Sequence, residues 1–264
     1  MKAVRSAPHD TAHMPAALRV AGIPVVPFET YDHAVACVER TIASNRKSFC
    51  VAVNPIKMHH AWHDPNLLHL LQEADVALCD GVGVSIASRV LYGRRVARIT
   101  GCDLFFRLVE LASRKGWGIF LLGASAESNT AARAALQGKY PRLQIAGWCD
   151  GYFQDSEKVI EQINASGAKM LFVALGSPKQ EYWIWRHRSA IAASFCMGVG
   201  GSFDVASGRL PRAPGFFRAT GTEFLFRFTL EPRKRLTHPA ILARFLLRVV
   251  GLRLTGASES VRWT

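Results

Sequence analysis

The sequence has few acidic residues. Asp and Glu number 20 against 33 Lys and Arg, so the 264-residue chain carries a formal net charge of +13 at pH 7. The excess is uneven, because residues 208–264 contain eleven basic residues and only three acidic ones. Such a distribution suits a polyanionic partner: nucleic acid, anionic lipid head groups, or a substrate that bears a diphosphate.

Long apolar runs, a secretion signal and paired cysteines are also missing. No run of 18 apolar residues occurs, so no segment meets the length criterion for a membrane-spanning helix. We expect residues 1–17 to form a disordered tail rather than a signal peptide, because Pro8, Asp10 and Pro15 interrupt them. The six cysteines form no C-x-x-C pair and lie mostly in apolar runs, which indicates reduced, buried thiols.

Strand-like and helical segments alternate from residue 18 to residue 199. After a short strand-like stretch over residues 18–28, we expect strands over residues 49–53, 75–79, 117–122, 143–148, 169–175 and 194–199. We expect helices over residues 31–44, 55–71 with a break near residue 64, 83–91, 101–115, 126–139, 157–164 and 180–188. Short apolar runs between helices predict a mostly parallel sheet covered on both faces, with ligands at the strand carboxyl ends.

The pattern changes near residue 208, where strand-like runs stop. We expect an α/β domain over residues 18–207 and a basic helical appendage over residues 208–264. In the appendage, Arg244 and Arg248 share one face of a helix that is otherwise largely apolar. Two interpretations stay open: a helix that lies on anionic lipid, or a helix packed on the core or on another subunit.

Polar residues follow two of the expected strands. Asn54 comes directly after residues 49–53, where its amide can bind a sugar hydroxyl or a uracil edge, or can cap the helix that Pro55 begins. Asp80 ends the next strand and precedes Gly81 and Gly83. A carboxylate there can accept a proton from an attacking hydroxyl, although Asp is also common in turns of this kind.

Other motifs suit phosphate or sugar groups. Arg98 precedes Thr100 and a helix start, which favours contact with an anion. Lys179 and Gln180 lie in the first turn of a helix that follows a buried strand, and the glycine-rich run near residue 200 could hold a pyrophosphate. The candidates for substrate binding are Asn54, Arg98, Thr100, Lys179, Gln180, Gly200 and Gly201.

Two further patterns argue against other chemistry. His59 and His63 have the spacing of metal ligands on a helix, with His60 and Asp64 beside them, but no third ligand motif accompanies them. We therefore expect no metal and no cofactor. A G-x-S-x-G nucleophile motif is also absent.

In order and spacing, these motifs resemble the WecG/TagA/CpsF family, glycosyltransferase family 26, from about residue 20 to residue 236. The motifs that carry the resemblance are Asn54-Pro55, Asp80-Gly-Val-Gly-Val84, Arg98-Ile-Thr-Gly101, Leu122-Gly123, Asp150-Gly-Tyr-Phe153, Ala174-Leu-Gly-Ser-Pro-Lys-Gln-Glu181, Gly198-Val-Gly-Gly-Ser-Phe-Asp204, Arg212-Ala-Pro214, Glu223-Phe-Leu-Phe-Arg227 and Glu231-Pro-Arg233.

The resemblance implies a Rossmann-like fold of the GT-E type and metal-independent transfer with inversion. The donor would be a UDP-sugar and the acceptor a sugar linked to undecaprenyl diphosphate, at the cytoplasmic face of the inner membrane. Asp80 matches the proposed catalytic base, and Asn54, Arg98 and Gln180 match pocket residues. The residues expected to contact the lipid diphosphate or the membrane are Arg227, Arg233, Lys234, Arg235, Arg244 and Arg248.

The sugar itself is less well defined. Some family members have a hydroxyl residue two positions before the pocket Asn, where this chain has Ala52. The Arg-rich tail is similar to that of exopolysaccharide members of the xanthan type, so we expect glucose transfer in polysaccharide biosynthesis. The alternatives are transfer of N-acetylmannosamine or its uronic acid, and a non-catalytic nucleotide-binding regulatory module at the membrane. We expect no nucleic-acid partner, because the Phe residues of the tail follow helical spacing; a homo-oligomer is possible.

Overall fold

A computed structural model describes residues 14–230, 232 and 236–255, except for the side chains of residues 218, 219 and 227. Its centre is a six-stranded parallel sheet with the order β4-β3-β8-β7-β5-β6. A separate antiparallel hairpin joins β1 and β2. The strands are β1 Leu18–Val20, β2 Ile23–Val25, β3 Ser48–Val53, β4 Val76–Cys79, β5 Ile119–Gly123, β6 Ile145–Cys149, β7 Met170–Ala174 and β8 Phe195–Gly198.

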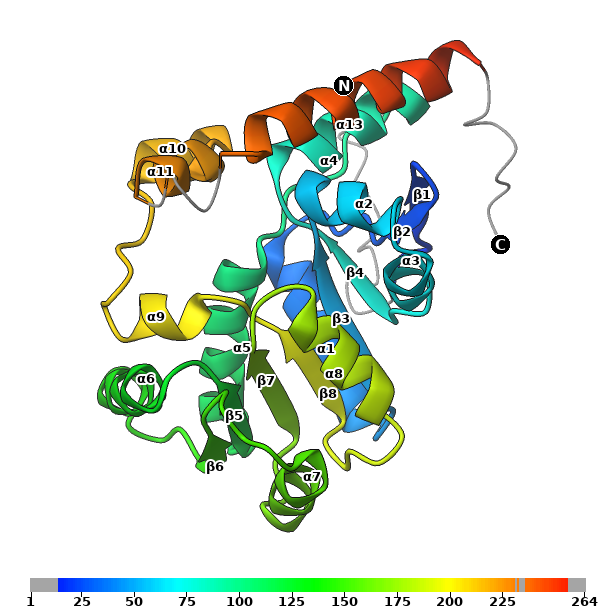
Figure 1. The fold of residues 1–264 in the computed structure, drawn as a ribbon. Helices are drawn as coiled ribbons and strands as arrows, with labels where there is room; N and C mark the ends of the chain where they lie inside the picture. The colour runs from blue at the N-terminus through cyan, green and yellow to red at the C-terminus, as the bar shows by residue number, and fades with distance from the viewer. Residues whose placement is uncertain (1–13, 231, 233–235, 256–264) are drawn as a thin grey trace, which may run out of the picture.

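Helices cover both faces of the sheet (Figure 1). Those up to β6 are α1 Tyr31–Ala43, α2 Pro55–Ala61, α3 Pro65–Gln72, α4 Val82–Tyr92, α5 Gly101–Lys115 and α6 Ala126–Lys139. Those after β6 are α7 Ser156–Ala165, α8 Lys179–His187, α9 Ser202–Ala206, α10 Gly215–Thr220, α11 Glu223–Leu230 and α13 His238–Leu254.

The strands alternate between two cores. In β3, Phe49, Val51 and Val53 point into a core shared with α2, α3, α4, α7 and α8. Cys50 and Ala52 point into a second core shared with α1, α5, α6 and α9. This two-sided burial is the reason why the strands read as continuous apolar runs rather than as alternating patterns.

The structure confirms the predicted strand and helix order, including the break between α2 and α3 at Asp64 and Pro65. One expectation was incomplete: residues 18–28 form a hairpin rather than one strand. Ala21 and Gly22 form its turn, with φ values of 48° and 88°. The short helix α9 was not predicted, because five residues are too few to show a helical period.

The cysteine prediction is confirmed. None of the six cysteines forms a disulfide, and the four at positions 37, 50, 79 and 196 are buried. Burial, followed by the charge of Asp80, raises the pKa of Cys79 to about 12, so its thiol stays neutral near neutral pH. These residues act as small apolar side chains of the core.

The last helix, α13, packs on the α/β body. Ile241, Phe245 and Val249 are buried along one face of it, and α13 contacts both α2 and α4. The Phe245 ring stacks on Trp62, with 5.8 Å between ring centroids. Packing on the core thus accounts for one face of this helix. Among the described residues, no helix is both long enough and apolar enough to cross a membrane.

Shortening a side chain on the buried face of α13 should destabilise the protein more than shortening one on the exposed face. Phe245 is fully buried, so Phe245→Ala should lower the free energy of unfolding by about 3–5 kcal/mol through lost burial and a cavity. Leu247 is 72% exposed, so the control Leu247→Ala should change it by less than about 0.5 kcal/mol. Denaturant unfolding measures both, and equal effects would contradict the packing of α13 on the body.

Candidate active site

The carboxyl ends of the parallel strands meet at one edge of the sheet, on the side where α10, α11 and α13 lie (Figure 1). Asn54 follows β3, and its side-chain oxygen accepts a hydrogen bond from the Lys57 backbone N–H at 2.9 Å. The capping interpretation of Asn54 is therefore correct. Asn54 remains half-buried at the strand end, so capping and ligand binding are compatible.

Asp80 lies beside Asn54 and the start of α5. An added Cβ at Gly81 would come within 3.8 Å of Asn54 Cβ, and one at Gly101 within 3.9 Å of an Asp80 carboxylate oxygen. An added Cβ at Gly83 would lie 2.5 Å from Pro55 Cγ, so only glycine allows the first turns of α2 and α4 to pack this closely. Two helix N-termini, those of α4 and α5, thus adjoin one half-buried carboxylate.

Arg98 lies near Asp80 and is held by the appendage. Its guanidinium donates to Glu223 at 2.8 Å, and the two side chains are 19% and 20% exposed. An added Cβ at Gly221 would lie 3.0 Å from Val82 Cβ and 3.6 Å from Arg98 Nε. Partial burial disfavours the charge of Arg98, but the bond to Glu223 and the nearby carboxylates outweigh it and raise its pKa. Arg98 is therefore a permanent cation at this edge.

Thr100 and Tyr31 support the start of α5. The Thr100 hydroxyl accepts from the Asp103 N–H, and the Thr100 N–H donates to the Tyr31 hydroxyl at 3.0 Å. Thr100 therefore caps the N-terminus of α5, and its side chain is buried, with only 5% exposed. Burial is the largest influence on the Tyr31 hydroxyl and raises its pKa, so it remains protonated.

Gln180 and the loop after β8 form the centre of the edge. Gln180 is 3% exposed, and its side-chain oxygen accepts from the Gly200 N–H at 2.9 Å. Gly200 has a φ of 52°, and both Gly200 and Gly201 are half-buried. Lys179, the neighbour of Gln180, is exposed in the first turn of α8. The predicted Gln180 and Gly200 are thus direct partners.

Of the arginines predicted to contact the lipid diphosphate or the membrane, Arg244 and Arg248 belong to the described part of α13. Arg248 lies over the Trp62 ring, 4.3 Å from its centroid. Arg244 and Arg248 both lower the pKa of His59, although burial contributes more to that shift. Both arginines therefore lie along the α2–α13 contact. The Arg227 side chain and residues 233–235 lie outside the described residues.

His59 and His60 lie on α2, and His63 follows that helix closely. His63 Nδ1 lies 2.8 Å from the His59 carbonyl oxygen, and Asp64 accepts a hydrogen bond from the Tyr182 hydroxyl. Within the described part of the chain, no group of three His, Cys, Asp or Glu residues is placed to hold a metal ion.

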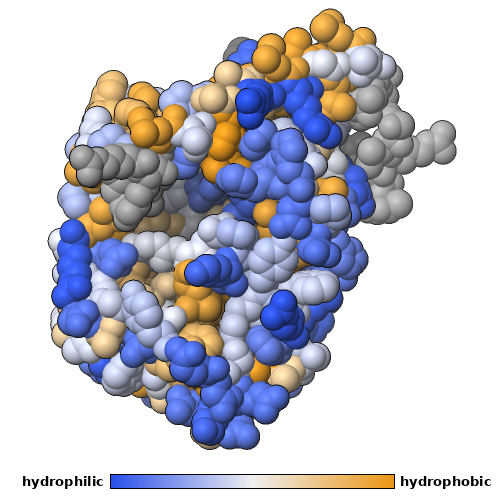
Figure 2. All heavy atoms as spheres, in the orientation of Figure 1, coloured by the Kyte–Doolittle hydropathy of each residue, from blue (hydrophilic) through white to orange (hydrophobic). Residues whose placement is uncertain are grey.

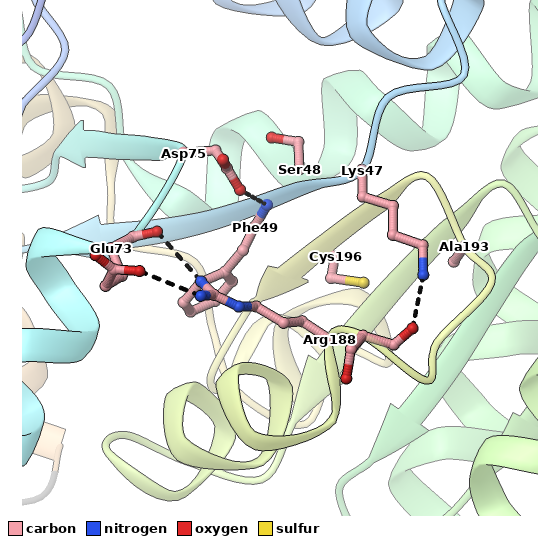
Figure 3. Close-up of a pocket in the computed structure, with 9 residues that line it drawn as sticks. Lys47, Ser48, Phe49, Glu73, Asp75, Arg188, Ala193 and Cys196 are labelled. Carbon is pink, nitrogen blue, oxygen red and sulfur yellow. Dashed lines mark hydrogen bonds and ion pairs between the residues drawn. The ribbon is translucent and has the colours of Figure 1, made fainter.

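A pocket of about 360 Å³ lies at the opposite edge of the sheet, where the strands begin (Figure 3). Its charged groups are bound to protein atoms: Lys47 donates to the Ser189 carbonyl oxygen, Arg188 pairs with Glu73, and Asp75 accepts from the Phe49 N–H. None of the residues predicted to bind substrate lines this pocket. It is therefore separate from the candidate site.

Four residues of the site region were not predicted from sequence: Tyr31, Lys57, Glu181 and Glu223. Lys57 and Glu181 are buried charges on helices whose apolar residues face the same core, a pattern that a periodicity analysis can find. Tyr31 and Glu223 reach the site from distant segments, and no local pattern predicts these contacts, although Glu223 begins one of the motifs that carry the family resemblance.

The arrangement suits transfer of a group between two anionic substrates. The Asp80 carboxylate can accept a proton. The Arg98 guanidinium and the N-termini of α4 and α5 can stabilise negative charge close to it. Amide groups of Asn54 and Gln180 flank the same edge.

Comparison with known proteins identifies the family. The family model described as "Glycosyl transferase WecG/TagA/CpsF family" matches residues 18–259. A protein of Bacillus spizizenii strain W23 is 35% identical over 205 residues, which cover 76% of this chain and 80% of the relative. One of Bacillus subtilis strain 168 is 37% identical over 180 residues, 68% of this chain and 70% of the relative. Both are named N-acetylglucosaminyldiphosphoundecaprenol N-acetyl-beta-D-mannosaminyltransferase. The chain therefore belongs to the glycosyl transferase WecG/TagA/CpsF family, and it is a glycosyltransferase.

Proposed function

We propose that this enzyme transfers N-acetylmannosamine from its UDP derivative to N-acetylglucosamine linked to undecaprenyl diphosphate. The names of the two relatives favour this sugar pair over glucose transfer, which the Arg-rich tail had suggested. The observation that carries the proposed chemistry is the Asp80 carboxylate, half-buried between the start of α5 and Asn54.

In the proposed reaction, Asp80 takes the proton of an acceptor hydroxyl while that oxygen attacks the anomeric carbon of the donor. A bond forms between the oxygen and the carbon, and the bond from the carbon to the UDP oxygen breaks with both electrons going to UDP. Attack from the side opposite UDP inverts the anomeric configuration. The proton stays on the Asp80 carboxyl group, and UDP leaves as an anion.

The departing charge needs stabilisation. Arg98 is a permanent cation near Asp80, and the first turns of α4, α5 and α8 present backbone N–H groups to the same edge. Lys179 adds an exposed positive charge at the start of α8. We assign the diphosphate of the donor to this cationic rim, and Asn54, Thr100, Gln180, Gly200 and Gly201 to the donor pocket and its supports.

The lipid-linked acceptor requires a membrane-facing surface, and the C-terminal helices offer one. Apolar side chains gather over α13 and over α10 and α11, which lie on the side of the molecule that bears the candidate site (Figure 2). They include Phe216, Phe224, Leu225, Leu246, Leu247, Val250 and Leu254, all at least 39% exposed. The basic residues Arg244, Arg248 and Arg253 lie on the same helix, α13. We assign residues 208–264 to a peripheral attachment on the cytoplasmic face of the inner membrane.

A screen of donors tests the sugar assignment. UDP-N-acetylmannosamine, UDP-glucose and UDP-N-acetylglucosamine are each incubated with lipid-diphosphate-linked N-acetylglucosamine, and the product is read by mass. We expect an added N-acetylhexosamine only with the first donor. Product from UDP-glucose alone would overturn the sugar assignment while leaving the reaction type intact. Nucleotide binding with no product from any pairing of these donors with lipid-linked N-acetylglucosamine or glucose would favour a non-catalytic module.

Substitution of Asp80 tests the base. Asp80→Asn keeps the shape of the side chain but cannot take the proton, so turnover should fall by about 10²- to 10⁴-fold. Binding of UDP, measured by calorimetry, should not weaken, because the change removes a negative charge and adds no bulk. Turnover near that of the unchanged enzyme would contradict the assignment.

Two leucines of α13 test the membrane surface. Leu247 and Leu254 are 72% and 81% exposed, so Leu247→Glu with Leu254→Glu should leave folding intact and weaken binding to anionic vesicles at least tenfold in a flotation assay. Leu247→Glu alone is compared with the matched control Tyr152→Glu, which also adds one charge and changes a 75% exposed aromatic residue in the loop after β6. Equal loss in both variants would mean that added negative charge alone weakens binding, and no loss would contradict the surface.

A further inference from the structure

We propose that Lys57 and Glu181 are positioning residues that fix Gln180, and through it the glycine loop after β8, in the geometry needed for donor binding. The inference rests on the proposed site, and it adds two residues that do not touch the substrate. Both belong to first turns of helices: Lys57 to α2, which follows β3, and Glu181 to α8, which follows β7.

The two side chains form a buried ion pair beside the end of β8. Lys57 Nζ lies 2.7 Å from Glu181 Oε1, and the residues are 6% and 0% exposed. Lys57 Nζ also donates to the Ala52 carbonyl oxygen at 2.7 Å, and the Lys57 backbone N–H donates to the Asn54 side chain. Because β8 lies between β3 and β7 in the sheet, this pair links the two strands that flank it.

Gln180 carries the link to the glycine loop. Its Nε2 donates to Glu181 Oε1 at 2.8 Å, and its Oε1 accepts from the Gly200 N–H at 2.9 Å. An ionised carboxylate only accepts hydrogen bonds, so Glu181 requires the NH2 group of the amide to face it. The amide oxygen must then face Gly200. The charge of Glu181 thus determines which way the Gln180 amide is turned.

The β8 backbone at Gly198 lies close to the side-chain amide of Gln180. An added Cβ at Gly198 would lie 2.7 Å from Gln180 Nε2 and 2.9 Å from its Cδ. Glycine at this strand position is therefore what leaves room for the Gln180 side chain. The loop that follows, from Gly198 to Ser202, is held between this side chain and α9.

Stability alone does not explain the network. A buried ion pair is often no more stabilising than apolar side chains of similar volume. Here Glu181 Oε2 is in addition buried without a hydrogen-bond partner, which makes folding less favourable. The helices α2 and α8 pack on one face of the sheet, and α9 packs on the other. Ligands of open α/β sheets bind in the crevice where successive helices go to opposite faces, and the ion pair lies beside that place.

The test replaces both charges together. Lys57→Met with Glu181→Leu replaces the ion pair by apolar side chains of similar volume, so the variant should still fold, which a melting curve checks. Because the Gln180 amide loses its partner, kcat/KM for the donor should fall about 10- to 100-fold. In a Gln180→Ala background the same pair of substitutions should cause no further loss, since it acts through Gln180.

A second variant moves the amide without changing any charge. Gly198→Ala should push Gln180 away from Gly200 and also lower kcat/KM about tenfold or more. Its control is Gly138→Ala in α6, where an added Cβ meets nothing within 4 Å, and this change should leave kcat/KM unaltered. If the charge-free double variant fails to fold, Gly198→Ala decides the question, and unaltered kcat/KM in it would overturn the inference.

The outcomes separate the two proposals. Unaltered kcat/KM in Gln180→Ala would show that the proposed site is wrong. A large loss in Gln180→Ala, together with unaltered kcat/KM in the folded charge-free variant, would overturn the positioning role alone. Further loss when the charge-free pair is added to Gln180→Ala would also overturn it, because the pair would then act by another route.

Discussion

The parallel pairing of β3, β8 and β7 is the constraint on which the site depends. Parallel strands end at the same edge of a sheet, so residues separated by more than a hundred positions in the chain arrive there together. The Asn54, Gln180 and Gly200 positions all follow from it. Each of the helices α2, α8 and α9 begins within a residue or a short turn of its strand. Their first residues are therefore close together, and buried polar contacts set the positions of the side chains.

Glycines allow the close contacts at this edge. An added Cβ at Gly83, Gly123 or Gly198 would lie within 3.0 Å of neighbouring atoms, which belong to Pro55, to the Ala174 backbone and to Gln180. Each contact joins segments that belong to, or directly follow, different strands of the sheet. The glycines therefore contribute to the candidate site by their lack of a side chain, while the proposed chemistry rests on Asp80 and Arg98.

The appendage connects the edge of the sheet to the surface of the molecule. Its α11 begins with Glu223, the ion-pair partner of Arg98, and its α13 closes the core over α2 and α4. The same helices expose apolar side chains on their outer faces. One segment thus contacts a candidate substrate-binding residue on one side and carries the proposed membrane surface on the other.

The sequence by itself determined the order of strands and helices, because burial on both faces produces continuous apolar runs with a recognisable length. The family could also be recognised from the sequence, through motifs that lie mostly near strand ends and partly in the basic tail. The interaction partners of the site residues depend on the tertiary structure. They include the Glu223 bond to Arg98, the Tyr31 bond to Thr100, and the Lys57–Glu181 pair across 124 positions. Local periodicity carries no information on such contacts, since they depend on which strands pair and on how helices pack afterwards.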